Sequence, residues 1–409
     1  MIRSLRKIWK DKRGNALIIA GAALPVLVGA AGLGTDTVQW VLWKRELQRA
    51  ADTAALAGAY AEMQTGESVS DAVGAHMTDN NHTGIALSSG YPQIAYPADT
   101  AAYKKAVQVT LAMQKTLGFS SMFLSSPPTI TAAATAALVN DGSYCVVALN
   151  GSTNSSITVG GSSSINMGCG AISNSTSSTA AVETNGASYN FVASPVAGVG
   201  GMPDSITGAT DIQEHHVAMP DPYAGKYPTS TSGMTCNKQV NGGNTNLTPG
   251  CYKDFKFTGN STYNLAAGTY FLNNTNFDVA GGVTVKGTGV TIILTGTAPG
   301  SVSTNGNSTI QLTAPTSGTY ANMLFIGTAS TDNTINGTNT SFYDGAMYFP
   351  NAAVNFTGTA GTMTQCAMVV ANYVNFSGNT NLQNSLTHPD GTPCQAASQV
   401  TGKSVRLIA

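Results

Sequence analysis

The sequence predicts a long N-terminal transmembrane helix with a small α+β region, followed by an all-β, right-handed parallel β-helix. An uncharged run behind a basic N-terminus indicates the first part, and an Ala-rich helical pattern continues beyond it. From about residue 144, short β-rich phrases recur between Gly, Asn, Ser and Thr, which indicates the second part. Charged residues make up only 10% of the chain. The fold must therefore depend on backbone hydrogen bonds and small or β-branched side chains more than on surface ion pairs.

The transmembrane prediction concerns residues 16–34, which contain no charged side chain. This length is close to the ~20 residues that a helix needs to cross a bilayer. Six Lys and Arg side chains precede the run, so the positive-inside rule predicts a cytoplasmic N-terminus and export of the remainder. A cleaved signal peptide and a buried core helix are the alternatives. The first usually has a shorter apolar region, and the second rarely follows so basic a head.

The net charge of −1 gives no general attraction to nucleic acid, and no nucleic-acid partner is expected.

The changes in composition along the chain predict its domain organisation. The predicted parts are a cytoplasmic basic head (1–14), a transmembrane and extended helix (15–66), a small α/β head (67–140), a parallel β-helix (141–385) with an excursion at about 203–241, and a C-terminal tail (386–409). Pro25 should kink the long helix.

Four phrases in the first 60 residues point to a family: Lys12-Arg13-Gly14-Asn15-Ala16, Leu24-Pro25-Val26-Leu27, Gly32-Leu33-Gly34-Thr35-Asp36, and residues 44–57. Together they resemble the TadG-like N-terminal domain of Flp/Tad (tight adherence) pilus-assembly proteins. The resemblance implies a pilin-like module in an accessory or minor-pilin-like component, with Flp/Tad pilins and assembly proteins as partners. It also implies a single-pass protein of the bacterial inner membrane, whose C-terminal body is periplasmic or extracellular and associated with the pilus.

The same resemblance marks Gly14 and Asn15 as a possible processing site. Processed prepilins of this system are cut after a Gly and carry a Glu at the fifth residue beyond the cut. Here the fifth residue is Ile19. Without that carboxylate, a buried N-terminal amine would have no opposite charge in apolar packing. Ile19 therefore argues against a repeating filament subunit and favours a capping, tip or membrane-retained protein.

The β-helix prediction depends on repeated phrases. Val354-Asn355-Phe356-Thr357-Gly358 recurs as Val374-Asn375-Phe376-Ser377-Gly378, 20 residues later, and residues 247–252 resemble residues 265–270. A period near 20 residues fits one coil of a parallel β-helix, in which Asn and Thr form ladders between coils. A β-sandwich is the alternative, but it seldom repeats phrases. Residues 144–384 also resemble the Gly/Asn-rich β-helical tails of TadG-like proteins.

Six cysteines lie beyond the apolar run, at positions 145, 169, 236, 251, 366 and 394. An even number in an exported domain predicts disulfides, and the missing CxxC spacing argues against zinc or redox chemistry. Fifteen connectivities remain open. Pairing of neighbours is the simplest: Cys145–Cys169, Cys236–Cys251 and Cys366–Cys394.

No enzyme signature is found, and neither a metal nor another cofactor is expected. Acidic residues are sparse beyond residue 144, and the group Asp211, Glu214, His215 and His216 is interpreted as a solvated loop. The predicted role is non-enzymatic: assembly, or adhesion through surface glycans. The candidate residues for glycan contact are aromatic: Tyr252, Tyr263, Tyr270, Phe342, Tyr343 and Tyr348. The rivals are a membrane-anchored polysaccharide-binding or polysaccharide-degrading β-helix and an envelope scaffold unrelated to pili.

Overall fold

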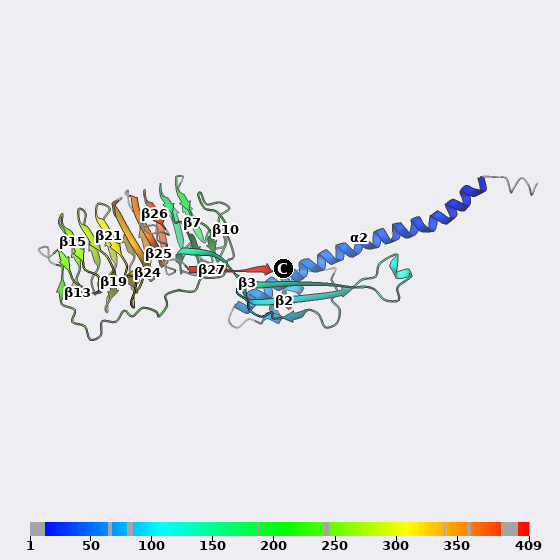
Figure 1. Ribbon diagram of the computed structural model, residues 1–409, viewed down its shortest axis with the longest axis horizontal. Coiled ribbons are helices and arrows are strands. Elements are labelled where there is room, and N and C mark those ends of the chain that lie inside the picture. The colour runs from blue at the N-terminus through cyan, green and yellow to red at the C-terminus, as the bar shows by residue number, and fades with distance from the viewer. Residues whose placement is uncertain are drawn as a thin grey trace, which may run out of the picture. The chain divides into compact units, whose positions relative to one another are not determined.

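The computed structural model describes residues 13–63, 68–79, 85–186, 188–240, 245–338, 340–357, 361–385 and 400–408. The chain divides into two compact units. Unit 1 comprises residues 1–139 and 405–409, and unit 2 comprises residues 140–404. The predicted fold class is confirmed, because a long N-terminal helix precedes a large body of parallel strands (Figure 1).

Unit 1 combines helices with a small antiparallel sheet. Its elements are α2 (Arg13–Met63), α3 (Val69–Asp79), β1 (Gln93–Ala95), β2 (Tyr103–Gln114), the short 3-10 helix η1 (Ser120–Met122) and the first half of β3 (Thr129–Ala148). Strand β2 pairs with β1 on one side and with β3 on the other, both antiparallel. The C-terminal half of α2 packs on this sheet through alanines that are completely buried, among them Ala50, Ala54 and Ala55.

Small residues allow this close approach of helix and sheet. A Cβ atom on Gly58 would lie 3.0 Å from Val107 of β2 and 3.1 Å from Val73 of α3. Alanine and glycine on one face of α2 therefore serve two purposes, since Ala favours the helix and neither side chain separates the backbones. The 51-residue helix spans roughly 77 Å at ~1.5 Å per residue.

Unit 2 is built from short strands that pair in parallel. The strands of this unit that follow β3 are β4 (Ile157–Gly160), β5 (Ser164–Asn166), β6 (Gly170–Ser173), β7 (Val182–Asn185), β8 (Asn190–Val192), β9 (Val196–Gly198), β10 (Ile212–Gln213), β11 (Lys238–Gln239), β12 (Asn246–Leu247), β13 (Gly250–Asp254), β14 (Lys256–Phe257), β15 (Thr262–Leu265), β16 (Gly268–Asn273), β17 (Phe277–Val279), β18 (Thr284–Gly287), β19 (Val290–Thr295), β20 (Val302–Thr304), β21 (Thr309–Thr313), β22 (Met323–Gly327), β23 (Asn333–Ile335), β24 (Ser341–Phe356), β25 (Gly361–Phe376) and β26 (Asn381–Ser385). Strand β27 (Val400–Ile408) closes the described chain and ends in unit 1.

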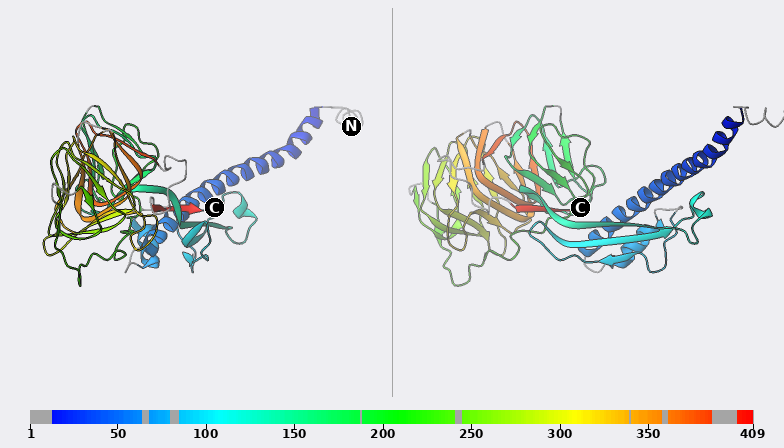
Figure 2. Two further views of the ribbon diagram at one scale, coloured as in Figure 1. Left: turned by 60° about the vertical axis from the view of Figure 1, so that its left-hand side comes forward. Right: turned by 45° about the vertical axis from the view of Figure 1, so that its right-hand side comes forward.

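Most strands pair with the third strand along the chain, so three strands make one coil of a three-sided solenoid (Figure 2). The repeated phrase explains how coils stack. Val354, Asn355 and Phe356 of β24 pair in register with Val374, Asn375 and Phe376 of β25. The two phenylalanine rings stack with centroids 5.2 Å apart, and the amide of Asn375 donates to the side-chain oxygen of Asn355 at 2.8 Å. Identical side chains therefore form ladders, as predicted for Asn.

The coils vary in length more than the predicted period of 20 residues. The amide of Asn375 reaches Asn355 across 20 residues, whereas Ser155 reaches Ala180 across 25 and Ile310 reaches Ser341 across 31. Most of the additional residues lie in turns between strands. Others form bulges at which the register shifts, as between Phe349 and Ala353 of β24. The interior of the solenoid is filled by aliphatic and aromatic side chains that are nearly all completely buried.

The order of the coils in space differs from their order in sequence. Strand β3 pairs with β6 on one side and with β25 on the other, although β25 lies more than 200 residues later. The same holds for β4, between β7 and β25, and for β5, between β8 and β26. The first and last coils therefore lie side by side in the middle of the solenoid. From there, strands β6 to β10 continue to one end, and strands β11 to β26 lead from the other end back to the middle.

A long connection between β10 and β11 links the two ends of the solenoid and lies within the excursion expected at 203–241, which is longer than the connection. It leaves β10 at one end, runs along the outside of one face, and reaches β11 at the other end (Figure 1). Along this path it covers an apolar stripe that crosses successive coils and includes Ile172, Ile326 and Ile293. Tyr223 of the connection packs on Tyr348, with ring centroids 5.5 Å apart.

Candidate membrane-anchoring and assembly site

The N-terminal half of α2 is an exposed apolar surface. Ile19, Leu24, Val26, Leu27 and Leu33 each expose more than half of their side-chain surface. Among the described residues, α2 from Ile19 onward is the one helix long and apolar enough to cross a membrane. Only 6% of its most apolar window is buried within the chain, unlike the core helix of a globular protein. Such a surface suits lipid or other helices as its surroundings.

The polar side chains at the end of this surface are satisfied within unit 1. The hydroxyls of Thr35 and Thr37 donate to the helix carbonyls of Gly32 and Leu33, at 2.8 and 2.7 Å. Two residues farther along α2 attach the helix to the edge of β3. Lys44 donates to the carbonyl of Thr131, and Gln48 donates to the carbonyl of Ala133 at 2.9 Å.

Asp36 connects α2 to the β2–β3 loop. One carboxylate oxygen accepts a hydrogen bond from the backbone amide of Phe119 at 3.0 Å. The other accepts from the amide of Ser120 at 2.5 Å and from its hydroxyl at 2.6 Å. These donors, first the Ser120 hydroxyl, lower the pKa of the Asp36 carboxyl from its usual value, against a smaller effect of burial. One turn earlier, a Cβ on Gly32 would overlap the Phe119 ring.

The predicted processing site and kink position lie in α2. Gly14 and Asn15 fall in its first turn, and Pro25 lies within it, without ending the helix. Ile19 is 64% exposed, on the apolar part of the helix. Cleavage after Gly14 and a kink at Pro25 stay predictions.

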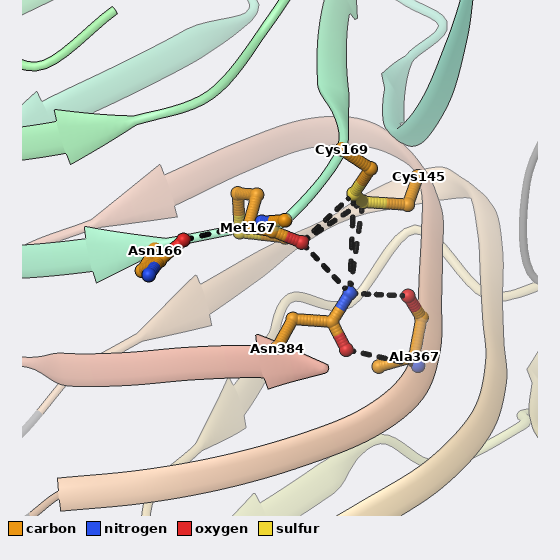
Figure 3. Close-up of a disulfide and its surroundings, with 7 residues drawn as sticks. Cys145, Asn166, Met167, Cys169, Ala367 and Asn384 are labelled. Carbon is orange, nitrogen blue, oxygen red and sulfur yellow. Dashed lines mark hydrogen bonds between the residues drawn. A yellow bond between two sulfur atoms is a disulfide. The ribbon is translucent and has the colours of Figure 1, made fainter. Parts of the chain in front are cut away.

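In unit 2, a disulfide joins Cys145 to Cys169, with their Cα atoms 5.9 Å apart. It lies in the first coil, where the last coil meets it (Figure 3). Asn384 of β26 fills the corner beside it. The amide of Asn384 donates to the carbonyls of Met167 and Ala367, both at 3.2 Å, and its oxygen accepts from the Ala367 amide at 3.1 Å. One buried side chain thus joins strands from the two coils.

A second disulfide joins Cys236 to Cys251, with Cα atoms 4.5 Å apart. It attaches the end of the long connection to β13, in the coil at the far end of the solenoid. Both disulfides match neighbour pairings that the sequence suggested. The third pairing includes Cys394, which lies outside the described residues.

The interpretation of the acidic and histidine-containing group as a solvated loop is wrong for His216. Its ring is buried, and Nε2 lies 2.6 Å from a carboxylate oxygen of Asp141. Nδ1 lies 2.7 Å from the carbonyl of Val217. The sequence alone does not indicate this pair, because Asp141 lies 75 residues from His216 in the chain. In the described part of the chain, no three His, Cys, Asp or Glu side chains come together as a metal site.

The structure also contradicts the prediction that these aromatic residues are available for glycan contact. Tyr252, Tyr263, Tyr270 and Tyr343 are buried inside the solenoid, and Tyr348 is covered by Tyr223. Phe342 is half-buried. The tyrosines can be buried because their hydroxyls find internal acceptors. Tyr270, for example, donates to the carbonyl of Ala266 at 2.8 Å.

The sequence identified the apolar helix but not the residues that attach it. Asp36 stood out only as the first acidic residue after the uncharged run. A carboxylate in that place is itself a signal, since it needs donors when it is nearly buried. Nothing local to Asn384 indicated its position between the first and last coils.

Together these features define a class of protein, in which an N-terminal helix of the membrane-anchoring type carries a small head and a β-helical body. A family model described as putative Flp pilus-assembly TadE/G-like matches residues 14–61. The chain therefore carries a TadE/G-like Flp pilus-assembly domain, which coincides almost completely with α2. Searches of curated proteins and of solved structures gave no match.

Proposed function

We propose that this protein is a non-enzymatic accessory or minor-pilin-like component of the Flp/Tad pilus system. Its N-terminal helix anchors it in the bacterial inner membrane, with the basic head in the cytoplasm and the β-helical body outside. The observation that carries this proposal is the coincidence of the TadE/G-like domain at 14–61 with α2, whose first half is exposed and apolar.

The two halves of α2 suit two different roles, contact with the membrane or other helices and attachment to the head. The first half presents aliphatic side chains outward, as needed in lipid or among the helices of pilins. The second half is fixed in the head by buried alanines. The helix can therefore associate with membrane or pilus helices without unfolding the head, and the β-helix serves as a rigid body for assembly or for surface adhesion.

Ile19 supports a role outside the repeating filament. In the α2 surface it presents a fully apolar side chain, with no carboxylate to pair with a neighbour's amine. We therefore propose that the chain is retained at the membrane, or caps the filament, with its N-terminus uncut at Gly14.

The proposal is tested in the native host with the full chain. Deletion of the gene should reduce pilus number and surface attachment, and the intact gene should restore both. A variant with Leu24→Arg and Leu27→Arg should fail to restore them and leave the membrane fraction, because each charge at mid-bilayer costs about 2.5–3.5 kcal/mol. A matched control, Asn381→Arg on an exposed position of β26, should restore both.

The location is tested by N-terminal sequencing of the protein from membrane and sheared-pilus fractions. An intact N-terminus in the membrane fraction supports the anchor. Protein that begins at Asn15 and co-purifies with sheared filaments in subunit amounts contradicts the proposal. Unchanged pilus number and attachment after deletion would indicate an envelope scaffold unrelated to pili.

A further inference from the structure

The β2–β3 loop of unit 1 carries an apolar tip. Met122, Phe123 and Leu124 are consecutive and expose 75%, 74% and 50% of their surface. No charged residue occurs from Thr116 to Pro128. Three adjacent large apolar side chains on the outside of a small head are unusual for a surface that faces only water.

The loop is held at the level where α2 leaves its uncharged run. Asp36 binds the amides of Phe119 and Ser120, and the ring of Phe119 packs over Gly32. Gly32 belongs to the uncharged run, which ends at residue 34. The loop extends alongside α2 toward the N-terminal end of the helix (Figures 1 and 2). If the run spans a bilayer, the loop tip lies at the outer boundary of the same bilayer.

The backbone of the tip is prepared for an apolar environment. Six consecutive amides, from Phe119 to Leu124, have acceptors inside unit 1. The first two donate to Asp36, and the next four donate to the carbonyls of Leu117, Phe119 and Ser120 at 2.9–3.1 Å. The hydroxyl of Ser121 also donates to the Gly118 carbonyl, at 3.0 Å. An unsatisfied amide in hydrocarbon costs several kcal/mol, so this arrangement removes that cost for the amides of the tip.

We propose that the tip, Met122, Phe123 and Leu124, inserts into the outer leaflet of the membrane beside α2, so that the head contacts the bilayer at two points. The lipid contact follows the pattern of interfacial apolar elements, which bury side chains to roughly 5–10 Å at the boundary of headgroups and acyl chains. This inference rests on the proposed membrane anchor. The second contact fixes the rotation of α2 about its own axis, which one helix alone does not fix.

The experiment uses the full chain in vesicles of phosphatidylethanolamine and phosphatidylglycerol. The photoreactive residue p-benzoylphenylalanine replaces, in separate proteins, Leu27 in α2, Phe123 at the tip, or Tyr96 as a matched control. Tyr96 is 61% exposed in unit 1. Tyr96 directly follows β1, whose last residue pairs with Gln108. From there the chain runs toward the end of β2 that is opposite the loop. Intact-protein mass after illumination reports covalent attachment of a phospholipid.

We expect a mass increase of one phospholipid at positions 27 and 123 and none at 96. An adduct at 27 without one at 123 overturns the inference and leaves the membrane anchor intact. No adduct at 27 overturns the anchor and, with it, the inference. The same proteins illuminated in native membranes provide the second arm. A protein adduct at 123 in place of the lipid adduct overturns the inference and assigns the tip to a partner helix.

Discussion

The carboxylate of Asp36 in the long helix accepts hydrogen bonds from both the backbone amide and the hydroxyl of Ser120, 84 residues later in the chain. This contact fixes the β2–β3 loop against α2 at the end of the apolar run. It is also the point at which a change of one side chain separates the loop from the helix without removing apolar packing elsewhere.

The first prediction concerns the variant Asp36→Asn. An amide has a single acceptor oxygen and no charge, so it cannot accept from Phe119 and Ser120 as the carboxylate does. We expect faster hydrogen exchange of the amides of residues 119–124, with unchanged exchange in β2. Glu62, whose side chain lies at the far end of α2, provides the control as Glu62→Gln. Equal exchange in Asp36→Asn and the parent chain would contradict the role of Asp36.

The same contact predicts a response to acid. The pKa of Asp36 is lower in the folded chain than in the unfolded one, because the folded chain supplies donors to the carboxylate. Its contribution to loop attachment is therefore complete above the unfolded pKa of ~3.9 and is lost as the pH falls through the lower, folded pKa. Loop exchange, corrected for the intrinsic effect of pH, should accelerate in that range in the parent chain. In Asp36→Asn it should not show this additional acceleration.

The third prediction concerns the contact between the first and last coils. Asn384→Leu leaves the carbonyls of Met167 and Ala367 and the amide of Ala367 without this partner. Losing a buried hydrogen-bond partner costs about 1–3 kcal/mol for each group left unsatisfied. We expect unit 2 to be destabilised by at least that amount in urea unfolding. The control Asn381→Leu, on an exposed position of the same strand, should stay within about 0.5 kcal/mol of the parent.

The two disulfides should differ in what they stabilise. Cys145–Cys169 lies in the middle of the solenoid, and its removal as a double Ser variant should lower the stability of the whole unit by about 3 kcal/mol. Cys236–Cys251 lies at the far end, so its removal should expose mainly residues 236–254 to protease. Limited proteolysis and urea unfolding measure both. Global loss from the second variant, with little from the first, would contradict the coil order.

The buried tyrosines predict a response to alkali. Burial raises the pKa of Tyr270 and Tyr343 well above its ordinary value. The unfolded chain releases these protons near pH ~10 and the folded chain retains them, so stability declines as the pH rises above that value. Tyr343→Phe loses the hydrogen bond to Asn336, about 1 kcal/mol at neutral pH. It should also make the alkaline decline less steep, as measured by unfolding at a series of pH values.

Much of the architecture could be predicted because it depends on local patterns. The uncharged run, the Ala-rich face and the repeated phrase at Val354 and Val374 each report their own surroundings. In a parallel β-helix, identical phrases at a fixed period pair with one another, so the pairing of Asn355 with Asn375 follows from the sequence.

The order of the coils could not be predicted in the same way. Every coil offers equivalent edges above and below, and nothing in residues 145–148 indicates that residues 369–371 will pair with them. The tyrosines misled for a related reason. An aromatic residue with a hydroxyl suits either a solvent-facing surface or an interior with a carbonyl in reach. Here the acceptor carbonyls lie a few residues before each tyrosine, at Thr248, Thr258, Ala266 and Asn336. Their directions depend on how those turns fold, which the residue types alone do not fix.

The central position of the first coil has a mechanical consequence. A solenoid whose chain begins at an end can be peeled one coil at a time, because the outermost strand has a neighbour on only one side. Here the chain enters at β3, which is paired on both sides, with β6 and with β25. Tension transmitted from the long helix through residue 140 must therefore shear two ladders at once before any coil unravels. Entry of the chain at the middle of the solenoid thus makes the body resistant to pulling through the long helix.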